Sequence, residues 1–515
     1  MQKQHWYIIW LFAVAKFFVP FLFINSIFQL HRDEYLYLAD SAHLAWGYIE
    51  MPPLLAFLGS ISLWFGDSVY AVYLWGALFG ALTMIIVGKT VIKMQGNVYA
   101  VMLACLAFLC SGFLRLDALF QPNFLDVFFW SLCAYCILSL IISNNNKYFY
   151  FLGLSFGLGM MSKYTIAFYG LAFLIGLIVS PYRKWLLNPH FYYAMALAGI
   201  IWLPNLLWQY NHHFPVIHHM QLLKERLLEN VKQSDFLVDQ LLITAPCFFV
   251  WISGLWYVLV TKKGRKYMVI GITYVAVIAL LLYFKGKGYY AAGLYPVLLG
   301  IGAVHLSASI QKHRIILLKW VMPVFMVLIT WRVFPLIMPY VSPADLTVLY
   351  KQRHADKLGV LKWEDGKNHT LPQDFADMLG WDEMASKTAK VYEQLPDSTK
   401  ANTFVFGDNY GQAGALIFYK NKLKLPVVYS DDASFVFWLP ESIKKQNILL
   451  IAHKPRDTTD YVFGHFKKVQ ILDSITNTYA REYGAKIMLY SQPDDSLPIV
   501  SKIAIDRLKA SYNIH

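Results

Sequence analysis

The polar stretch from His31 to Pro53 carries the side chains of this chain that are best suited to chemistry. It follows one long apolar segment and precedes another, and its charged residues are Arg32, Asp33, Glu34, Asp40 and Glu50. Charged groups beside a membrane span are costly unless they lie in water or serve a function. We therefore interpret this stretch as an active-site loop on a membrane surface.

The spacing within this loop predicts a helix that gathers polar groups on one face. If residues 34–45 are helical, Asp33, Tyr37 and Asp40 follow one another at spacings of four and three. For Asp40, a position on a solvated helix face is the alternative. We expect four side chains of the loop to contact the substrates: Tyr37, Asp40, Tyr48 and Glu50.

The elements that must position this loop are membrane spans. The chain has 515 residues, of which 57% are hydrophobic and 17% aromatic, and its mean hydropathy is +0.43. Apolar blocks of about 20 residues, the length that crosses a bilayer, recur up to residue 332. We predict an α-helical polytopic membrane protein with about eleven to thirteen spans. A shorter apolar block at 53–65 is expected to be a re-entrant or interfacial helix.

The net charge of +13 is explained by membrane topology, because no basic helix or RNA-binding motif accompanies it. Lys and Arg recur in six short loops that fall on one side if every block spans once, and we assign that side to the cytoplasm. We expect no nucleic-acid partner. The exoplasmic side then receives the polar loops at 31–53, 115–122, 210–240 and 285–290.

The composition changes near residue 335, where charges and turn residues become common. Short β-type runs such as 403–408 and 447–453 alternate with helix-compatible stretches such as 409–421. We predict two domains, a transmembrane domain at 1–334 and an exoplasmic α/β domain at 335–515. All five cysteines lie in apolar blocks, so we interpret them as packing residues and expect no disulfide in the α/β domain.

Several segments of the chain resemble a known family. They are RDEYLYLADSAHLAWGYIEMPPLLAFL (32–58), QPNFLDVFFW (121–130), GLGMMSKYT (157–165), NLLWQYNHHFPVIHHM (205–220), YYAAGLYPVLLG (289–300) and the tail segment 404–435. They are similar to the dolichyl-phosphate-mannose protein mannosyltransferase-like family, glycosyltransferase family 39, which has the GT-C fold and includes the bacterial lipid A aminoarabinose transferase. The resemblance implies a membrane glycosyltransferase that uses a polyprenyl-phosphate-linked sugar on the exoplasmic side.

Two positions depart from the pattern of the aminoarabinose transferases. Met51 stands where those enzymes have a basic residue in the aromatic–acidic–proline element, and Leu36 stands where their first motif has an arginine. Contacts with the donor phosphate must therefore come from other residues. The identities of the sugar and of the acceptor are not carried over.

The resemblance assigns catalysis to acidic residues. The acidic pair of the family's first loop corresponds to Asp33 and Glu34, and its second acidic position corresponds to Asp126. A carboxylate in reach can accept the proton of an acceptor hydroxyl as the sugar C1–O bond breaks, the role we expect for Asp33. The structural alternatives are a cap of a helix that begins at Glu34 for Asp33, a supporting role for Glu34, and a favourable helix-dipole position for Asp126.

Cationic side chains near the exoplasmic surface are the candidates for binding the donor phosphate. They are Lys163, Arg115, Lys285 and Lys287, together with the neighbouring Tyr289. Charge-assisted hydrogen bonds to phosphate are strong. Lys163 is the first choice because its neighbours are apolar, where an unpaired charge would be costly. Snorkelling to the interface, or an aromatic belt in the case of Tyr289, is the alternative.

Histidines in the 210–240 segment raise the question of a divalent metal ion. The ligand set we consider is Glu50, His212, His213 and His218, with His219 beside them. No HExxH-type spacing is present, and surface histidines without a metal are common. Both interpretations stay open.

The expected function is transfer of one sugar from a polyprenyl phosphate to an exoplasmic acceptor, a glycolipid or a lipid A-like molecule. One alternative keeps the fold and moves the sugar to protein Ser or Thr, as in protein O-mannosyltransferases. Another is a transporter of lipid-linked sugars without chemistry, which would place charges at the span centres. The expected partners are the donor, a lipid or protein acceptor and membrane lipids, in a bacterial cytoplasmic membrane.

Overall fold

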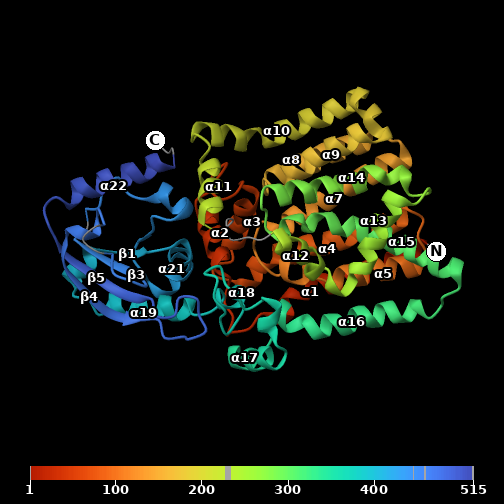
Figure 1. Ribbon diagram of the computed structural model, residues 1–515. Coiled ribbons are helices and arrows are strands. Elements are labelled where there is room, and N and C mark those ends of the chain that lie inside the picture. Colours follow the sequence, from red (N-terminus) through yellow and green to blue (C-terminus); the bar gives the residue numbers. More distant parts are fainter. Residues whose placement is uncertain (1, 227–232, 445, 457–459, 513–515) are drawn as a thin grey trace.

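The computed structural model describes residues 2–226, 233–444, 446–456 and 460–512. Figure 1 shows a bundle of long helices beside a smaller domain of helices and strands, which is formed by the C-terminal part of the chain. The predicted fold class, a helical membrane protein with a C-terminal α/β domain, is confirmed.

The bundle is built from apolar helices that lie side by side. They are α1 (Gln2–Phe18), α4 (Val69–Lys93), α5 (Val98–Leu109), α7 (Asn123–Ser143), α8 (Lys147–Met160), α9 (Ile166–Val179), α10 (Pro189–Asn211), α12 (Gln233–Ile243), α13 (Phe248–Val260), α14 (Met268–Tyr283), α15 (Tyr295–His313) and α16 (Leu318–Ile337). Three shorter helices lie at the end that faces the α/β domain: α2 (Arg32–Ala42), α3 (Leu54–Leu63) and α11 (Pro215–Arg226). The short helix α6 (Phe113–Leu116) connects α5 to α7.

In the part of the chain that the structure describes, seven helices are long and apolar enough to cross a membrane. The number rises to nine if each of two bent helix pairs is one span; these pairs bend by 110° after α9 and by 65° after α12. The count is lower than predicted because the apolar blocks near 98–114 and 148–162 form helices of 12 and 14 residues. Such helices are shorter than the about 20 residues that cross hydrocarbon alone.

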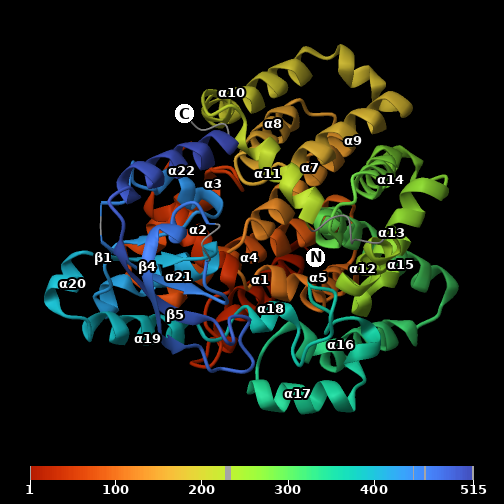
Figure 2. The same cartoon turned by 60° about the vertical axis from the view of Figure 1, so that its left-hand side comes forward.

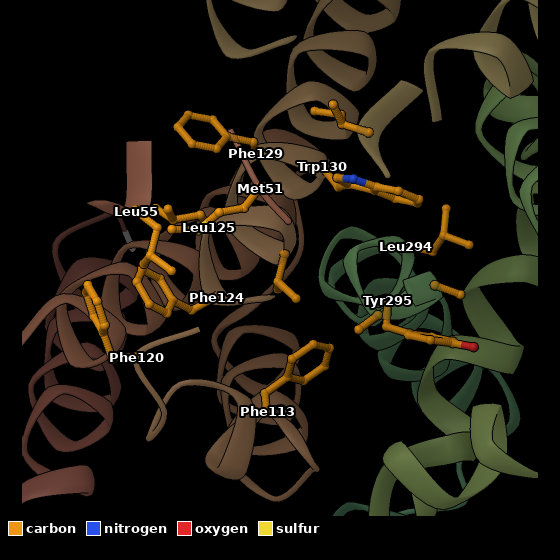
Figure 3. Close-up of a cluster of buried hydrophobic side chains, with 14 of the residues drawn as sticks. Met51, Leu55, Phe113, Phe120, Phe124, Leu125, Phe129, Trp130, Leu294 and Tyr295 are labelled. Atoms are coloured by element: carbon orange, nitrogen blue, oxygen red, sulfur yellow. The ribbon is translucent and has the colours of Figure 1, made fainter. Parts of the chain in front are cut away.

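The core of the bundle surrounds α7. Phe124, Leu125, Phe129 and Trp130 of this helix are buried. Figure 3 shows these side chains in one cluster with Met51, Leu55, Phe113, Phe120, Leu294 and Tyr295. The cluster joins α7 to α3, α6 and α15, and it fixes the start of α7, where polar side chains gather.

The α/β domain contains a five-stranded sheet with strand order β2-β1-β3-β5-β4. The strands are β1 (Thr403–Gly407), β2 (Val428–Tyr429), β3 (Asn447–Ala452), β4 (Phe466–Ser474) and β5 (Lys486–Pro493). Strand β1 runs parallel to β2 and β3, whereas β5 is antiparallel to β3 and β4. The described helices of this part are α17 (Pro343–Gln352), α18 (Gln373–Ala376), α19 (Trp381–Glu393), α20 (Asp397–Ala401), α21 (Tyr410–Leu423) and α22 (Leu497–Ser511).

Alternate residues of the strands face opposite layers, as the period of two requires. Val405 and Leu449 pack in one core with residues of α19 and α21, whereas Phe404 and Leu450 pack with Leu497 at the start of α22. Helix α21 also lies along α2, and Figures 1 and 2 both show this contact between the two domains. The α/β domain therefore sits directly on the predicted active-site loop.

Candidate active site

Helix α2 begins two residues earlier than predicted. It starts at Arg32, and His31 is its N-cap, with the side chain accepting a hydrogen bond from the Asp33 N–H. The alternative in which Asp33 caps a helix beginning at Glu34 is therefore wrong. Since a histidine replaces the usual Ser, Thr, Asp or Asn cap, the sequence carried only a weak signal for this start.

Glu34 is fully buried and supports the loop. Its carboxylate accepts hydrogen bonds from the backbone N–H groups of His31 and Phe120, both at 2.5 Å. Burial raises the pKa of Glu34 to about 7, although these two bonds act in the opposite direction. Glu34 thus ties the start of α2 to the segment before α7, which agrees with the supporting role considered for it.

The two bonds of Glu34 lead to a prediction about stability. In Glu34→Gln, one oxygen is replaced by an NH₂ group that cannot accept a hydrogen bond, so one buried N–H loses its partner. We expect the free energy of unfolding to fall by about 1–3 kcal/mol. Thermal melting of the purified variant in detergent measures this loss, and an unchanged melting temperature would contradict the role of Glu34.

Asp33 stays accessible, with 34% of its side chain exposed. Its Oδ1 accepts a hydrogen bond from the Tyr410 hydroxyl at 2.8 Å, and its Oδ2 accepts one from the Gln121 amide at 3.3 Å. Tyr410 is the first residue of α21, and Gln121 lies two residues before the start of α7. Two neutral donors from distant segments therefore orient this carboxylate.

Asp40 is fully buried, so the alternative of a solvated helix face is wrong. Both of its carboxylate oxygens lack a hydrogen-bond partner among the described residues, and the Tyr48 hydroxyl bonds to its backbone carbonyl at 3.0 Å. Burial, together with the nearby charge of Glu50, raises the pKa of Asp40. The raised pKa favours the neutral acid, whose burial costs less than that of a carboxylate.

Glu50 fastens the end of the loop to the α/β domain. Its carboxylate accepts hydrogen bonds from the backbone N–H and the hydroxyl of Ser434, both at 2.6 Å. Burial raises the pKa of Glu50 to about 7, although the bonds from Ser434 oppose the shift. Tyr37, in contrast, is partly exposed on the face of α2 that carries Asp33.

Lys163 lies beside the start of α7, as the phosphate hypothesis requires. Its Nζ donates a hydrogen bond to Asn123 Oδ1 at 2.7 Å, and it lies 5.1 Å and 4.6 Å from the ring centroids of Tyr289 and Tyr290. Asp126 is buried one turn further along α7 and accepts a hydrogen bond from the Thr165 hydroxyl at 2.8 Å. The structure thus brings three predicted residues, Lys163, Tyr289 and Asp126, to one place.

The segment 121–123 joins the two halves of the site. Asn123 Nδ2 donates to Gln121 Oε1 at 2.9 Å, and Gln121 in turn donates to Asp33. Because Asn123 also accepts from Lys163, one chain of hydrogen bonds runs from the predicted catalytic carboxylate to the predicted phosphate-binding cation. Gln121 and Asn123 were not selected from the sequence, although both belong to the QPN segment at 121–123.

The other predicted cations differ in their surroundings. Arg115 is paired with Asp374 at 2.6 Å, and the second oxygen of Asp374 lies 3.3 Å from His31. Lys287 lies 3.5 Å from Glu364, whereas Lys285 is exposed. Arg115 therefore links the loop before α7 to the segment that contains α18, while Lys163 remains the cation nearest to the start of α7 through its bond to Asn123.

The predicted metal ligands do not come together. Among the described residues, no three His, Cys, Asp or Glu side chains form a group that could hold a metal ion. His212 stacks on Trp208 with ring centroids 4.1 Å apart, and His218 lies against Tyr512 at 5.1 Å. The carboxylate of Glu50 instead accepts the two hydrogen bonds from Ser434. A requirement for a divalent metal ion stays a prediction, for which activity in the presence of EDTA is the measurement.

Comparisons with known proteins concern the family and the fold of the chain. Residues 50–208 match the model of the family described as dolichyl-phosphate-mannose-protein mannosyltransferase. Over 239 residues, 45% of the chain, the sequence is 23% identical to the lipid A galacturonosyltransferase RgtD of Rhizobium johnstonii. The match spans about half, 50%, of the length of that relative.

The fold is similar to that of two solved structures of ArnT from Cupriavidus metallidurans. The structure bound to undecaprenyl phosphate matches over 94% of this chain and 99% of that chain, with a TM-score of 0.60 and 14% identity. The apo structure matches over 96% and 100%, with a TM-score of 0.61 and 14% identity. The predicted resemblance to the family and to its GT-C fold is confirmed.

Proposed function

We propose that the chain is a membrane glycosyltransferase that moves one sugar from a polyprenyl-phosphate donor to a glycolipid acceptor on the exoplasmic side. The match of residues 50–208 to the dolichyl-phosphate-mannose-protein mannosyltransferase model and the similarity of the fold to ArnT support this activity. The similarity to RgtD, a lipid A galacturonosyltransferase, supports the glycolipid acceptor. The solved structure of ArnT with undecaprenyl phosphate supports the type of donor.

The observation that carries this proposal is the hydrogen-bonded chain from Asp33 to Lys163 through Gln121 and Asn123. It holds a carboxylate suited to proton transfer and a cation suited to a phosphate in one fixed arrangement. The rings of Tyr289 and Tyr290 lie against the cation, so it is surrounded by aromatic surface on that side.

This arrangement supports a displacement at the sugar C1 atom. The acceptor hydroxyl attacks C1, its proton passes to Asp33, and the bond between C1 and the phosphate oxygen breaks. The electron pair of that bond stays with the polyprenyl phosphate, and Lys163 stabilises the negative charge gained there. If the acceptor group is already an ionised phosphate, no base is needed, and Asp33 orients the sugar instead.

The proposal is tested by comparing cells with and without the protein. Mass spectrometry of membrane glycolipids and glycoproteins is expected to show glycolipids that lack one sugar when the protein is absent. Unchanged glycolipids together with glycoproteins that lose a sugar would show that the acceptor is protein Ser or Thr instead of a glycolipid. No change in either class would contradict the transferase activity.

The proposed side of the active site leads to a prediction about topology. Asn421 is exposed near the end of α21, and all five native cysteines are buried, so Asn421→Cys offers a selective label. We expect a membrane-impermeant maleimide to label this cysteine in right-side-out vesicles. Labelling only in inside-out vesicles would place the α/β domain in the cytoplasm and would contradict the proposal.

A further inference from the structure

The hydroxyl of Tyr410 makes the shorter of the two hydrogen bonds that the Asp33 carboxylate accepts among the described residues. It lies 2.8 Å from Oδ1, whereas the Gln121 amide lies 3.3 Å from Oδ2. Tyr410 is 377 residues away along the chain and belongs to the α/β domain, where no active-site residue was predicted. The α/β domain therefore reaches the predicted catalytic carboxylate.

Two glycines allow α21 to approach α2 this closely. A Cβ atom at Gly414 would lie 2.7 Å from backbone atoms of Tyr35, and a Cβ at Gly411 would lie 2.5 Å from Arg32 Cγ. Distances under 3 Å are not tolerated without a shift of the neighbouring atoms. The contact between the two helices thus requires glycine at both positions.

Tyr410 is held at its backbone and at one face of its ring. Its backbone N–H donates to Asp432 Oδ2 at 3.1 Å, and the guanidinium carbon of Arg32 lies 4.1 Å from its ring centroid. Such a cation–π contact fixes the plane of the ring. The side chain of Tyr410 is therefore held in one orientation, with its hydroxyl directed at Asp33.

We propose that Tyr410 is a positioning residue of the active site and that the α/β domain is thereby part of the catalytic unit. This inference rests on the proposed function. The short bond from Tyr410 occupies Oδ1, so Oδ2, which has only the longer bond, is the oxygen that takes the acceptor proton. A carboxylate held in one orientation does not have to reorganise during the reaction.

The test compares Tyr410→Phe with wild type in sugar transfer from a polyprenyl-phosphate donor in liposomes. The phenylalanine ring keeps the contact with Arg32 and lacks only the hydroxyl. We expect kcat to fall about tenfold while KM for the donor stays the same, because the lost bond orients the base and does not bind the donor.

The other charged or titratable groups around Asp33 are unchanged in this variant. They are His31, Arg32, Tyr37, Tyr289 and Asp377. The matched control is Tyr419→Phe, which removes another hydroxyl of α21, one that lies 3.4 Å from the Tyr35 hydroxyl. This control is expected to keep both kcat and KM. A wild-type kcat in Tyr410→Phe, or a fall that is matched by a change of KM for the donor, would overturn the inference.

A second measurement separates this inference from the proposed function. Carbodiimide reacts with protonated carboxyl groups, so its rate of modification of Asp33, followed by peptide mass spectrometry, reports the loss of the Tyr410 bond without any substrate. We expect this rate to rise severalfold in Tyr410→Phe and to stay unchanged in Tyr419→Phe. Equal rates in all three proteins would overturn the positioning role. Failure of the wild type to move sugar would overturn the proposed function.

Discussion

Replacement of Asp33 by asparagine is expected to abolish most of the sugar transfer while leaving the fold intact. Asparagine has the same size, and its amide oxygen still accepts the hydrogen bond from Tyr410. The group that accepts the acceptor proton is lost, and general-base catalysis contributes about 10²–10⁴-fold in rate. We therefore expect kcat to fall by that factor, with donor affinity and melting temperature near those of the wild type.

The control for this variant is Glu34→Gln, whose expected loss lies in stability. Glu34 bonds two backbone N–H groups and does not face the proposed reaction, so its variant should retain more turnover than Asp33→Asn at temperatures where both are folded. Near-normal turnover of Asp33→Asn would leave Asp33 as a structural residue. A large fall in its melting temperature without a specific kinetic loss would lead to the same conclusion.

Loss of the ammonium group in Lys163→Ala is expected to weaken donor binding more than any other single cation change at the site. A charge-assisted hydrogen bond to phosphate contributes about 1.5–3 kcal/mol, which corresponds to about ten- to a hundredfold in affinity. Burial lowers the pKa of Lys163 to about 8, and the charge of Asp126 opposes this shift. The affinity should therefore also fall as the pH rises above 8, where the lysine loses its proton.

The control for the donor is Lys285→Ala, since Lys285 is exposed on the same side of the bundle. We expect its affinity for the polyprenyl-phosphate sugar to change little. Isothermal calorimetry in detergent, or competition with unlabelled polyprenyl phosphate, gives both values. Equal donor affinity in wild type and Lys163→Ala would remove Lys163 from the phosphate site.

Local spacing identified some of the residues that lie close together, and their roles stay predictions. Asp33 and Tyr37 share one face of α2, and Lys163, between α8 and α9, lies beside the start of α7, the helix that contains Asp126. The length and hydropathy of the apolar blocks were sufficient to predict the helical bundle. The change of composition near residue 335 was sufficient to predict the α/β domain. These properties depend on near neighbours in the chain, so they can be seen in the sequence.

The interactions that complete the site connect distant segments and leave no local signal. Tyr410 is one of 34 tyrosines, and no pattern in the segment 404–435 indicates that this tyrosine contacts Asp33. Arg115 was a candidate for binding the donor phosphate, but it is paired with Asp374, a residue 259 positions away. Asp40 is polar and was open to interpretation as solvated, yet its side chain is fully buried. Such contacts are decided by the tertiary fold.

The predicted number of spans exceeds the seven to nine that the described helices provide, for a related reason. An apolar block of 17 residues can be a span or a shorter helix that other helices cover, and hydropathy alone does not separate the two. Helix α5 is such a case, because seven of its 12 residues are buried inside the bundle. Packing against protein removes the need to cross the full hydrocarbon layer.

The most direct test of the central claim is sugar transfer by the purified protein in liposomes. The donor carries an isotopic label in its sugar and is supplied from a polyprenyl-phosphate-sugar fraction, with a glycolipid fraction as the acceptor. We expect the wild type to move the label to the glycolipid and to release polyprenyl phosphate in equal amount, and Asp33→Asn to do so at least about a hundredfold more slowly. Label that stays on the polyprenyl phosphate in the wild type, or equal rates in the two proteins, would contradict the account.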